Sequence, residues 1–547
     1  MHRRYALLVP LVALVACSTR EARPPAPAQP PAILFDDLGT HRHPVSTRVP
    51  EAQQYFDQGL RLVWAFNHDE ATRAFTEAAR LDPDCAMAWW GIALAAGPNY
   101  NDPGNPERDR RAYEALRKAV ALERKVSAQE RAYIEALAKR YTKEPPPDRK
   151  ALDVAYADAM REVMRRYPDD LDAATLFAES MMDLRPWDLW SRDGEPRPGT
   201  EEIVATLESV LKRDPEHPGA NHYYIHAVEA STHPERGVAS ADRLRRLVPG
   251  AGHLVHMPSH IYMRVGRYGD AVAANERAVA VDRAYIARVK PDGLYPMMYY
   301  PHNLDFLWAA ASMEGRSRDT IRTARELAAV SSPEMARQMA DAEPPLVAPL
   351  VALARFGRWK DILREPDFPD DLHYARAIRH YARGLAFTRL GHAREAASEH
   401  AALETDVQAI PPERKFVQVL PAQRIAALAG TVLAGELAAS RGRTDDAIRH
   451  LEDAVRIQDE LPYMEPPPWY FPVRQSLGAV LLKANRAAAA EAVYRQDLRR
   501  NPENGWSLHG LAESLRAQGK PAEAAAVEQR RRKAWARADV RLVASRF

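Results

Sequence analysis

Cysteine is almost absent from this sequence, with two residues among 547. Two cysteines form at most one disulfide, which excludes a disulfide framework as the main source of stability. Glycine is scarce at 25 residues whereas alanine is abundant, and this balance favours helices over sheets. Neither sign of charge is in excess, since 76 Lys and Arg face 74 Asp and Glu, so a nucleic-acid partner is not expected.

The overall composition narrows the class of protein further. With 27% charged residues the chain is too polar for a polytopic membrane protein, and with 46% hydrophobic residues it is too apolar to be wholly disordered. Its length suits about three or four ordinary domains, or one long repetitive domain. We therefore expect a soluble, largely helical and electrically balanced protein.

The N-terminus carries a targeting pattern. Residues 1–16 combine a basic start with an apolar run that is too short for a stable membrane span, which predicts a signal peptide. The run ends at LVAC (Leu14–Cys17), which resembles the lipobox of bacterial lipoproteins. This resemblance implies cleavage before Cys17 and lipidation of that residue, and Ser18 implies sorting to the outer membrane of Gram-negative bacteria. An ordinary signal peptide with an incidental cysteine is the alternative.

A proline-rich tether is predicted for residues 17–33, beginning with the lipidated Cys17. Its segment RPPAPAQPP is stiff and extended, so it would hold the folded part away from the membrane. The expected location is therefore the periplasmic side of a bacterial cell envelope, where the lipid anchor makes the membrane a partner.

A repeat of about 34 residues begins at Ala52. In AQQYFDQGLRLVWAFNHDEATRAFTEAARLDPD, Gly59 permits close approach of a second helix, Ala71 lies at the helix crossing, and Pro83 ends the unit. The C-terminal end repeats the pattern with Gly478, Leu481, Ala490, Tyr494 and Pro502. These segments resemble the tetratricopeptide repeat (TPR). Over most of residues 50–535 the resemblance implies an all-α, TPR-type helical-hairpin solenoid with irregular loop insertions.

The folded part is divided into three segments. Residues 34–165 carry N-terminal repeats with a charged helical insertion, residues 166–335 carry the central repeats, and residues 336–547 carry C-terminal repeats and a capping helix. The array is interrupted by irregular segments at 183–199, 286–301 and 461–472. Long loops in a compact array usually serve a function. In such arrays the first helices of successive repeats line a concave groove, where binding normally occurs.

Eight of the 18 histidines lie between residues 217 and 302. In NHYYIHAVE, His222, His226 and Glu229 are at i, i+4 and i+7 and therefore share one helical face. His256 and His260 lie 34 residues after His222 and His226, which places the two pairs at equivalent positions of adjacent repeats.

The second histidine segment, GHLVHMPSHIYM, is open to two interpretations. If it is helical, His253, His256 and His260 share one face. Pro258 favours the alternative, because the residue before a proline avoids helical geometry. A kink at Met257 would then leave His253 and His256 on an entering loop.

The repeat register adds three further candidates to the groove. It sets His302 level with His253 and Asp305 level with His256. Aligning the preceding repeat sets Glu179 level with His226. Four neighbouring repeats are thus predicted to direct imidazoles and carboxylates into one stretch of groove.

This set of residues is typical of a transition-metal site for Cu, Zn or Fe. Helical histidines at i and i+4 can chelate one ion, and packed helices lie about 8–10 Å apart, within reach of a shared ion. Six or seven candidate ligands exceed the four of a closed structural site, so a two-metal or catalytic site is expected. The candidates are His222, His226, His256 and His260 first, Glu229 as ligand or base, then His253 and His302, and last Glu179 and Asp305.

Two functions remain open from the sequence. One is a metal-dependent enzyme, either a hydrolase or an oxidoreductase, in which the histidines converge and are shielded from water. The other is a non-catalytic TPR scaffold that binds an envelope protein or peptide, with the histidines spread along an open groove. Tyr295 and Tyr299, in the segment before His302, are expected either to cover the groove as a lid or to pack among themselves. Trp187, beside the Glu179 helix, is expected either to contact a ligand or only to cover an edge.

Overall fold

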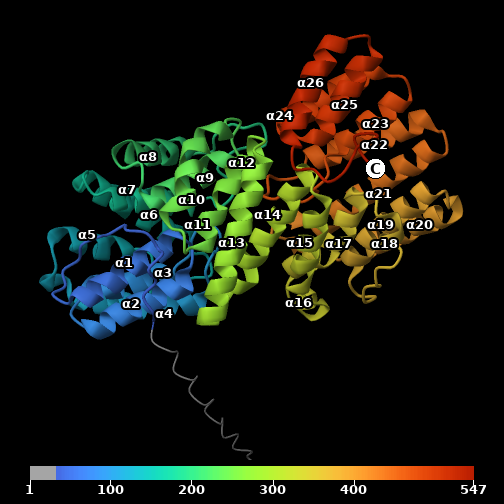
Figure 1. The fold of residues 1–547 in the computed structure, drawn as a ribbon. Coiled ribbons are helices and arrows are strands. Elements are labelled where there is room, and N and C mark those ends of the chain that lie inside the picture. The colour runs from blue at the N-terminus through green and yellow to red at the C-terminus, as the bar shows by residue number, and fades with distance from the viewer. Residues whose placement is uncertain (1–31) are drawn as a thin grey trace, which may run out of the picture.

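The computed structural model describes residues 32–547 (Figure 1). The predicted signal peptide 1–16, the lipidation site Cys17 and nearly all of the tether 17–33 lie outside these residues. Within the described part, helices account for every element except one two-stranded antiparallel sheet, β1 (Lys415–Phe416) and β2 (Leu420–Pro421). No helix of residues 32–547 has both the length and the apolar character needed to cross a membrane.

The N-terminal segment contains six α-helices, the charged helix α4 among them, and the short 3-10 helix η1. They are α1 (Pro50–Trp64), α2 (His68–Leu81), α3 (Ala86–Ala96), α4 (Pro106–Ala121), η1 (Glu123–Lys125), α5 (Ala128–Leu137) and α6 (Lys150–Arg166). An extended arm, residues 32–49, precedes α1.

The central segment carries the histidines. Its elements are α7 (Leu171–Met182), α8 (Thr200–Arg213), α9 (Pro218–Glu229), η2 (Pro234–Gly237), α10 (Val238–Leu247), α11 (Gly252–His256), α12 (Pro258–Arg264), α13 (Tyr268–Val289), the π-helical turn η3 (Tyr295–Tyr299), α14 (Tyr300–Met313) and α15 (Ser317–Ala329).

The C-terminal segment continues the array. Its helices are α16 (Pro333–Gln338), η4 (Ala340–Ala342), α17 (Glu343–Arg355), α18 (Trp359–Ile362), α19 (His373–Leu390), α20 (Ala393–Ala409), α21 (Ala422–Ser440), α22 (Thr444–Asp459), α23 (Val473–Lys483), α24 (Ala487–Arg500), α25 (Gly505–Ala517) and α26 (Pro521–Ala534).

The glycines of the repeat pattern lie where two helices of a pair cross. A Cβ atom on Gly59 of α1 would lie 2.6 Å from the ring of Phe75 in α2, and one on Gly478 of α23 would lie 2.4 Å from the ring of Tyr494 in α24. Only a residue without a side chain permits this approach. The chain is therefore an all-α array of helical hairpins of TPR type, and the predicted fold class is confirmed.

The C-terminal helices return to the central segment, where Figure 1 shows them beside α12 and α14. The indole Nε1 of Trp506 donates to the carbonyl of Ser312 (3.0 Å), and that of Trp535 donates to the carbonyl of Met313 (2.9 Å). Both tryptophans are buried. These contacts join α25 and the end of α26 to the C-terminus of α14.

The irregular segment 461–472 also reaches the central repeats. The hydroxyl of Tyr463 donates to Glu229 (3.4 Å), and the hydroxyl of Tyr470 donates to Asp305 (2.8 Å). The segment therefore covers the ends of α9 and α14 that face the histidines. This cover separates the central histidines from open solvent.

Candidate metal centre

Three helices position the predicted ligands. His222 and His226 lie on α9, His253 and His256 on α11, and His260 on α12. Of the two interpretations of this segment, the structure has the helical one, because Met257 keeps helical torsion angles (φ −49°, ψ −36°) and joins α11 to α12. Because proline lacks a backbone N–H, one helical hydrogen bond is missing at Pro258. The backbone nevertheless continues in helical geometry from α11 into α12.

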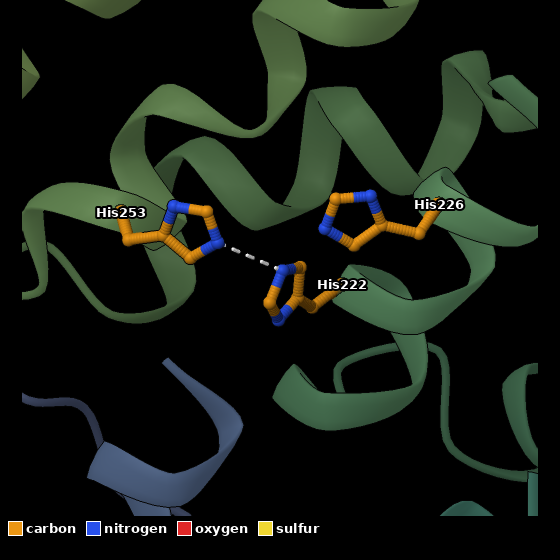
Figure 2. Close-up of side chains that lie close together, drawn as sticks. All are labelled: His222, His226 and His253. Atoms are coloured by element: carbon orange, nitrogen blue, oxygen red, sulfur yellow. Dashed lines mark hydrogen bonds between the residues drawn. The ribbon is translucent and has the colours of Figure 1, made fainter. Parts of the chain in front are cut away.

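His222, His226 and His253 form the first trio of imidazoles. One nitrogen from each ring lies within 4.8 Å of the others. The Nε2 atoms of His253 and His222 are 3.2 Å apart, and Figure 2 shows all three rings turned toward one space between α9 and α11. None of the three residues is more than 1% exposed.

His256, His260 and His302 form the second trio, again with ligand atoms within 4.8 Å of one another. The Nε2 atoms of His256 and His260 are 2.8 Å apart. The ring of His302 on α14 lies 4.8 Å from that of His256 and 5.8 Å from that of His260, centroid to centroid. His302 therefore groups with this pair, although the repeat register set it level with His253.

Glu229 links the two trios. Its Oε1 accepts from Nδ1 of His226 (2.7 Å), and its Oε2 accepts from Nδ1 of His260 (2.6 Å). The carboxylate is fully buried and comes from the last turn of α9. Both of its oxygens are thus engaged in orienting one histidine of each trio, which is the usual role of a carboxylate behind a metal-ligating imidazole.

Two other acceptors fix the remaining histidines of the helical pairs. Nδ1 of His222 donates to the carbonyl of Trp64 at the end of α1 (2.6 Å). Nδ1 of His256 donates to Oδ1 of Asn275 (2.6 Å), whose amide nitrogen in turn donates to the carbonyl of Ala271 (2.8 Å). In each ring the proton is therefore on Nδ1, and Nε2 carries a lone pair.

Within residues 32–547, some of the imidazole nitrogens of the two trios have no hydrogen-bond donor. Nε2 of His226 is buried without any hydrogen-bond partner, and so is Nδ1 of His253. Nε2 of His256 faces Nε2 of His260. Two facing lone pairs repel each other unless a cation, either a proton or a metal ion, lies between or beside them.

Burial keeps most of these imidazoles neutral. It lowers the pKa of His222, His253 and His256 well below the ordinary value of 6.5, and neighbouring imidazoles add to this effect. The same causes lower the pKa of His302 to about 3. Neutral imidazole is the form that binds metal ions.

His260 and Glu229 form the charged part of the site. Burial lowers the pKa of His260, but the charge and hydrogen bond of Glu229 outweigh it, so the pKa is raised above 6.5. Burial likewise raises the pKa of Glu229, yet His260 and His226 together lower it to about 2. The negative charge of Glu229 is thus stabilised by the imidazoles of His226 and His260.

Six aromatic rings surround the trios: Phe66, Tyr100, Trp187, Tyr223, Tyr299 and Phe306. The ring of Phe66 lies 4.6 Å from that of His222, and that of Tyr299 lies 4.7 Å from that of His253. Trp187 and Tyr299 come from irregular segments, which therefore pack over the site. Phe66, in the turn after α1, was not anticipated, because nothing in the repeat pattern distinguishes it.

Segment 461–472 contributes two residues that sequence reasoning missed. Tyr463 hydrogen-bonds both Glu229 and Glu465. Oε2 of Glu465 is buried without a partner, and burial together with Glu229 raises the pKa of Glu465 to about 7, against the opposing effect of His260. The segment was recognised as irregular, but its position beside α9 depends on packing more than 230 residues away in the chain.

The last two candidate ligands lie outside the trios. Asp305 accepts from Trp308 (2.8 Å) and Tyr470, and Glu179 is buried beside Asp183 and Arg140. Within residues 32–547 neither belongs to a cluster of converging ligand atoms. The repeat register predicted that both side chains point into the groove with the histidines, but in the structure they contact other residues.

A second histidine cluster surrounds Asp172 at the start of α7. Its oxygens lie 2.9 Å from Nε2 of His41, 2.7 Å from Nδ1 of His43 and 3.1 Å from Nε2 of His217. Nδ1 of His217 accepts the N–H of Ala220 (3.1 Å), so its proton is on Nε2 and points at Asp172. This nitrogen is not free for a metal ion, and we describe the cluster as the Asp172 clasp, which holds the arm 32–49.

Comparisons with known proteins support no closer assignment. No protein family and no curated protein sequence matches the chain. Among solved structures, the human IFIT1 dimer with m7Gppp-AAAA is 13% identical, with 90% of this chain and 91% of that chain covered and a TM-score of 0.32. The Cut9 and Hcn1 hetero-tetramer of APC/C is 12% identical, with 89% and 74% covered and a TM-score of 0.29. The TPR-type fold is therefore assigned from the helix pairs of this chain itself.

Proposed function

We propose that this protein binds two transition-metal ions in its central repeats, one in each histidine trio. The observation that carries the proposal is the shared orientation of four imidazoles. His222, His226, His256 and His260 each have Nδ1–H held by an acceptor, which leaves Nε2 of each ring to face the other members of its own trio. That is the arrangement of imidazoles prepared for a metal ion.

Burial supports metal binding over peptide binding at this place. Five of the six histidines are at most 1% exposed, and segment 461–472 lies across the site. A peptide-binding groove requires an open surface with ligand contacts spread along it. Here the histidines converge instead, and the aromatic rings that surround them exclude water.

The donor set favours Zn, Cu or Fe, because imidazole nitrogen suits these ions. Three protein ligands per ion leave open coordination positions, as in catalytic sites, where such an ion supplies Lewis-acid or redox chemistry. Glu465 and Tyr463 lie at the edge of the site and can hold a proton close to it. A metal-dependent hydrolase or oxidoreductase is the enzyme class that this geometry supports.

The test is elemental analysis of the full-length chain expressed without a histidine tag. We expect about two equivalents of Zn, Cu or Fe in the wild-type protein and loss of both in the double variant His222→Ala/His256→Ala. The matched control is His233→Ala/His392→Ala, which removes two exposed histidines and should retain the metal.

Absence of metal from the wild-type protein, even after incubation with each ion, would overturn the proposal. The second candidate would then be a TPR scaffold, and affinity capture of envelope proteins would be the next experiment. Equal loss of metal in the control variant would show that binding is not confined to the trios.

We also propose that the protein is a lipoprotein of the bacterial envelope, anchored through Cys17. The support is the lipobox pattern Leu14–Cys17 behind an apolar run. Cells that express the wild-type chain are expected to incorporate labelled palmitate into it, whereas Cys17→Ala should remain unlabelled and leave the membrane fraction. Labelling of the Cys17→Ala variant would contradict this assignment.

A further inference from the structure

A separate cavity of about 50 Å³ lies in the C-terminal segment, away from the histidines. Helices α17, α19, α21 and α23, segment 461–472 and the end of the chain surround it. Its lining includes Arg355, Arg389, Arg546, Glu436, Tyr381 and Trp469. Cationic groups therefore outnumber acidic side chains around a largely aromatic space.

Arg355, at the end of α17, is the unusual member of this lining. Only 6% of the residue is exposed, and its guanidinium carbon lies 3.7 Å from the centroid of Trp506. Nη1 donates to Oε1 of Gln475 (2.7 Å), whereas Nε and Nη2 are buried and have no hydrogen-bond partner. Within residues 32–547 no carboxylate accepts from this guanidinium.

The nearby acids are already committed to other donors. Glu436 pairs with Arg389 (2.9 Å) and with Arg546. Asp497 accepts from two neutral donors, Ser507 (2.5 Å) and Asn504 (3.2 Å), and its charge raises the pKa of Arg355 without a direct hydrogen bond. Arg389 also donates to a backbone oxygen of Phe547, the last residue of the sequence given (3.1 Å). Within the described residues, no acid of the lining thus accepts a hydrogen bond from Nε or Nη2 of Arg355.

A buried charge without a counter-ion is strongly unfavourable. Burial lowers the pKa of Arg355 to about 9, so the side chain remains protonated at neutral pH. Its Nε–H and Nη2–H nevertheless lack an acceptor within residues 32–547, which leaves them available to an external ligand. Nε–H and Nη2–H form one edge of the planar guanidinium, and that edge matches two oxygens of a carboxylate or phosphate group.

We infer that this cavity binds a small oxyanion, a carboxylate or a phosphate group, through Nε and Nη2 of Arg355. Stacking of the guanidinium on Trp506 fixes the plane in which the two oxygens lie. Tyr381 and Trp469 supply apolar surface for the body of the ligand. This site is independent of the histidine trios.

The experiment is isothermal titration calorimetry on the full-length chain at pH 7 and constant ionic strength, with chelator present. Phosphate, acetate and benzoate are titrated separately. We expect saturable binding of at least one anion, weakened at least 10-fold by Arg355→Lys, which keeps the charge but loses the bidentate edge. Binding of phosphate alone identifies a phosphate site, and binding of acetate or benzoate identifies a carboxylate site.

The control is Arg364→Lys, the same change at an exposed arginine that pairs with Asp361 (3.2 Å). It should bind as the wild type does, and so should His222→Ala/His256→Ala. If Arg355→Lys fails to fold, the wild-type chain still decides the matter, because a binding anion must raise its melting temperature more than chloride does. No saturable binding of any of the three anions, or equal affinity in Arg355→Lys and wild type, would overturn the inference.

Discussion

Replacement of Glu229 by leucine is expected to weaken metal binding at both trios by about 10–100-fold. Glu229 accepts from His226 of the first trio and from His260 of the second. Without these acceptors, no hydrogen bond favours the tautomer of His226 or His260 that has its proton on Nδ1. The ring can then place the proton on Nε2, the atom that must bind the metal ion.

Glu229→Gln makes a sharper comparison. Glutamine has one acceptor oxygen and one amide group that only donates, so it can serve only one of the two histidines. We expect one trio to keep its affinity and the other to lose it, which lowers the stoichiometry from two ions to one at a fixed low metal concentration. Asn275→Leu should weaken the second trio alone, because Asn275 orients His256.

Competition with a chromophoric chelator, with Zn²⁺ as the added ion, measures both effects. The matched control is Glu235→Gln, the same change at an exposed glutamate that contacts only His233 (3.0 Å). Circular dichroism and melting temperature establish that each variant is folded. Unchanged stoichiometry and affinity in folded Glu229→Leu would contradict the assigned role of this carboxylate.

Local periodicity was sufficient to find the helical histidine pairs. The i, i+4 spacing places each pair on one helical face, and the 34-residue offset places the two pairs at equivalent positions of adjacent repeats. Both features could therefore be predicted without a structure. Pro258 left the second histidine segment open between a helix and a loop, and the packing of α11 and α12 on α13 outweighs the tendency of a pre-proline residue to avoid helical geometry. The role of glycines such as Gly59 could likewise be predicted, because they contact a helix that is adjacent in the sequence.

The remaining features of the site depend on contacts between distant parts of the chain. Trp64 accepts from His222 across 158 positions, and Tyr463 reaches Glu229 across 234. Such contacts depend on the rotation accumulated over many repeats, which no single repeat encodes. The return of Trp506 to α14 has the same origin. Sequence therefore predicted which histidines come together better than it predicted the residues that orient and cover them.

Asp172→Asn is expected to destabilise the protein by roughly 3 kcal/mol, because it removes the charged partner of a buried cluster. Its carboxylate hydrogen-bonds His41, His43 and His217, and asparagine offers only one oxygen in place of two. His41 and His43 belong to the arm 32–49, so the arm should be the first part to detach. Urea unfolding measures the free energy, and hydrogen exchange of the arm amides locates the loss.

The pH dependence of this effect distinguishes the clasp from ordinary packing. Burial raises the pKa of Asp172, but the three histidines outweigh it, and the pKa lies well below its ordinary value of 3.8. A depressed carboxyl pKa contributes stability that is present above about pH 4 and is lost as the pH falls below it. Burial lowers the pKa of His43, but Asp172 outweighs it and raises the pKa above 6.5. That contribution is present below about pH 6.5 and is lost as the pH rises through the raised pKa.

The clasp should therefore be strongest between about pH 4 and pH 6.5 and should weaken on both sides of this window. The difference in unfolding free energy between wild type and Asp172→Asn is expected to be largest near pH 5–6 and smaller at pH 3 and pH 8.5. The two histidine trios titrate equally in both proteins, so their contributions cancel in this difference. Asp169→Asn, at an exposed aspartate that pairs with Arg213 (2.9 Å), should show no comparable pH dependence. A difference that is constant across the whole range would mean that Asp172 acts through its shape and not through its charge.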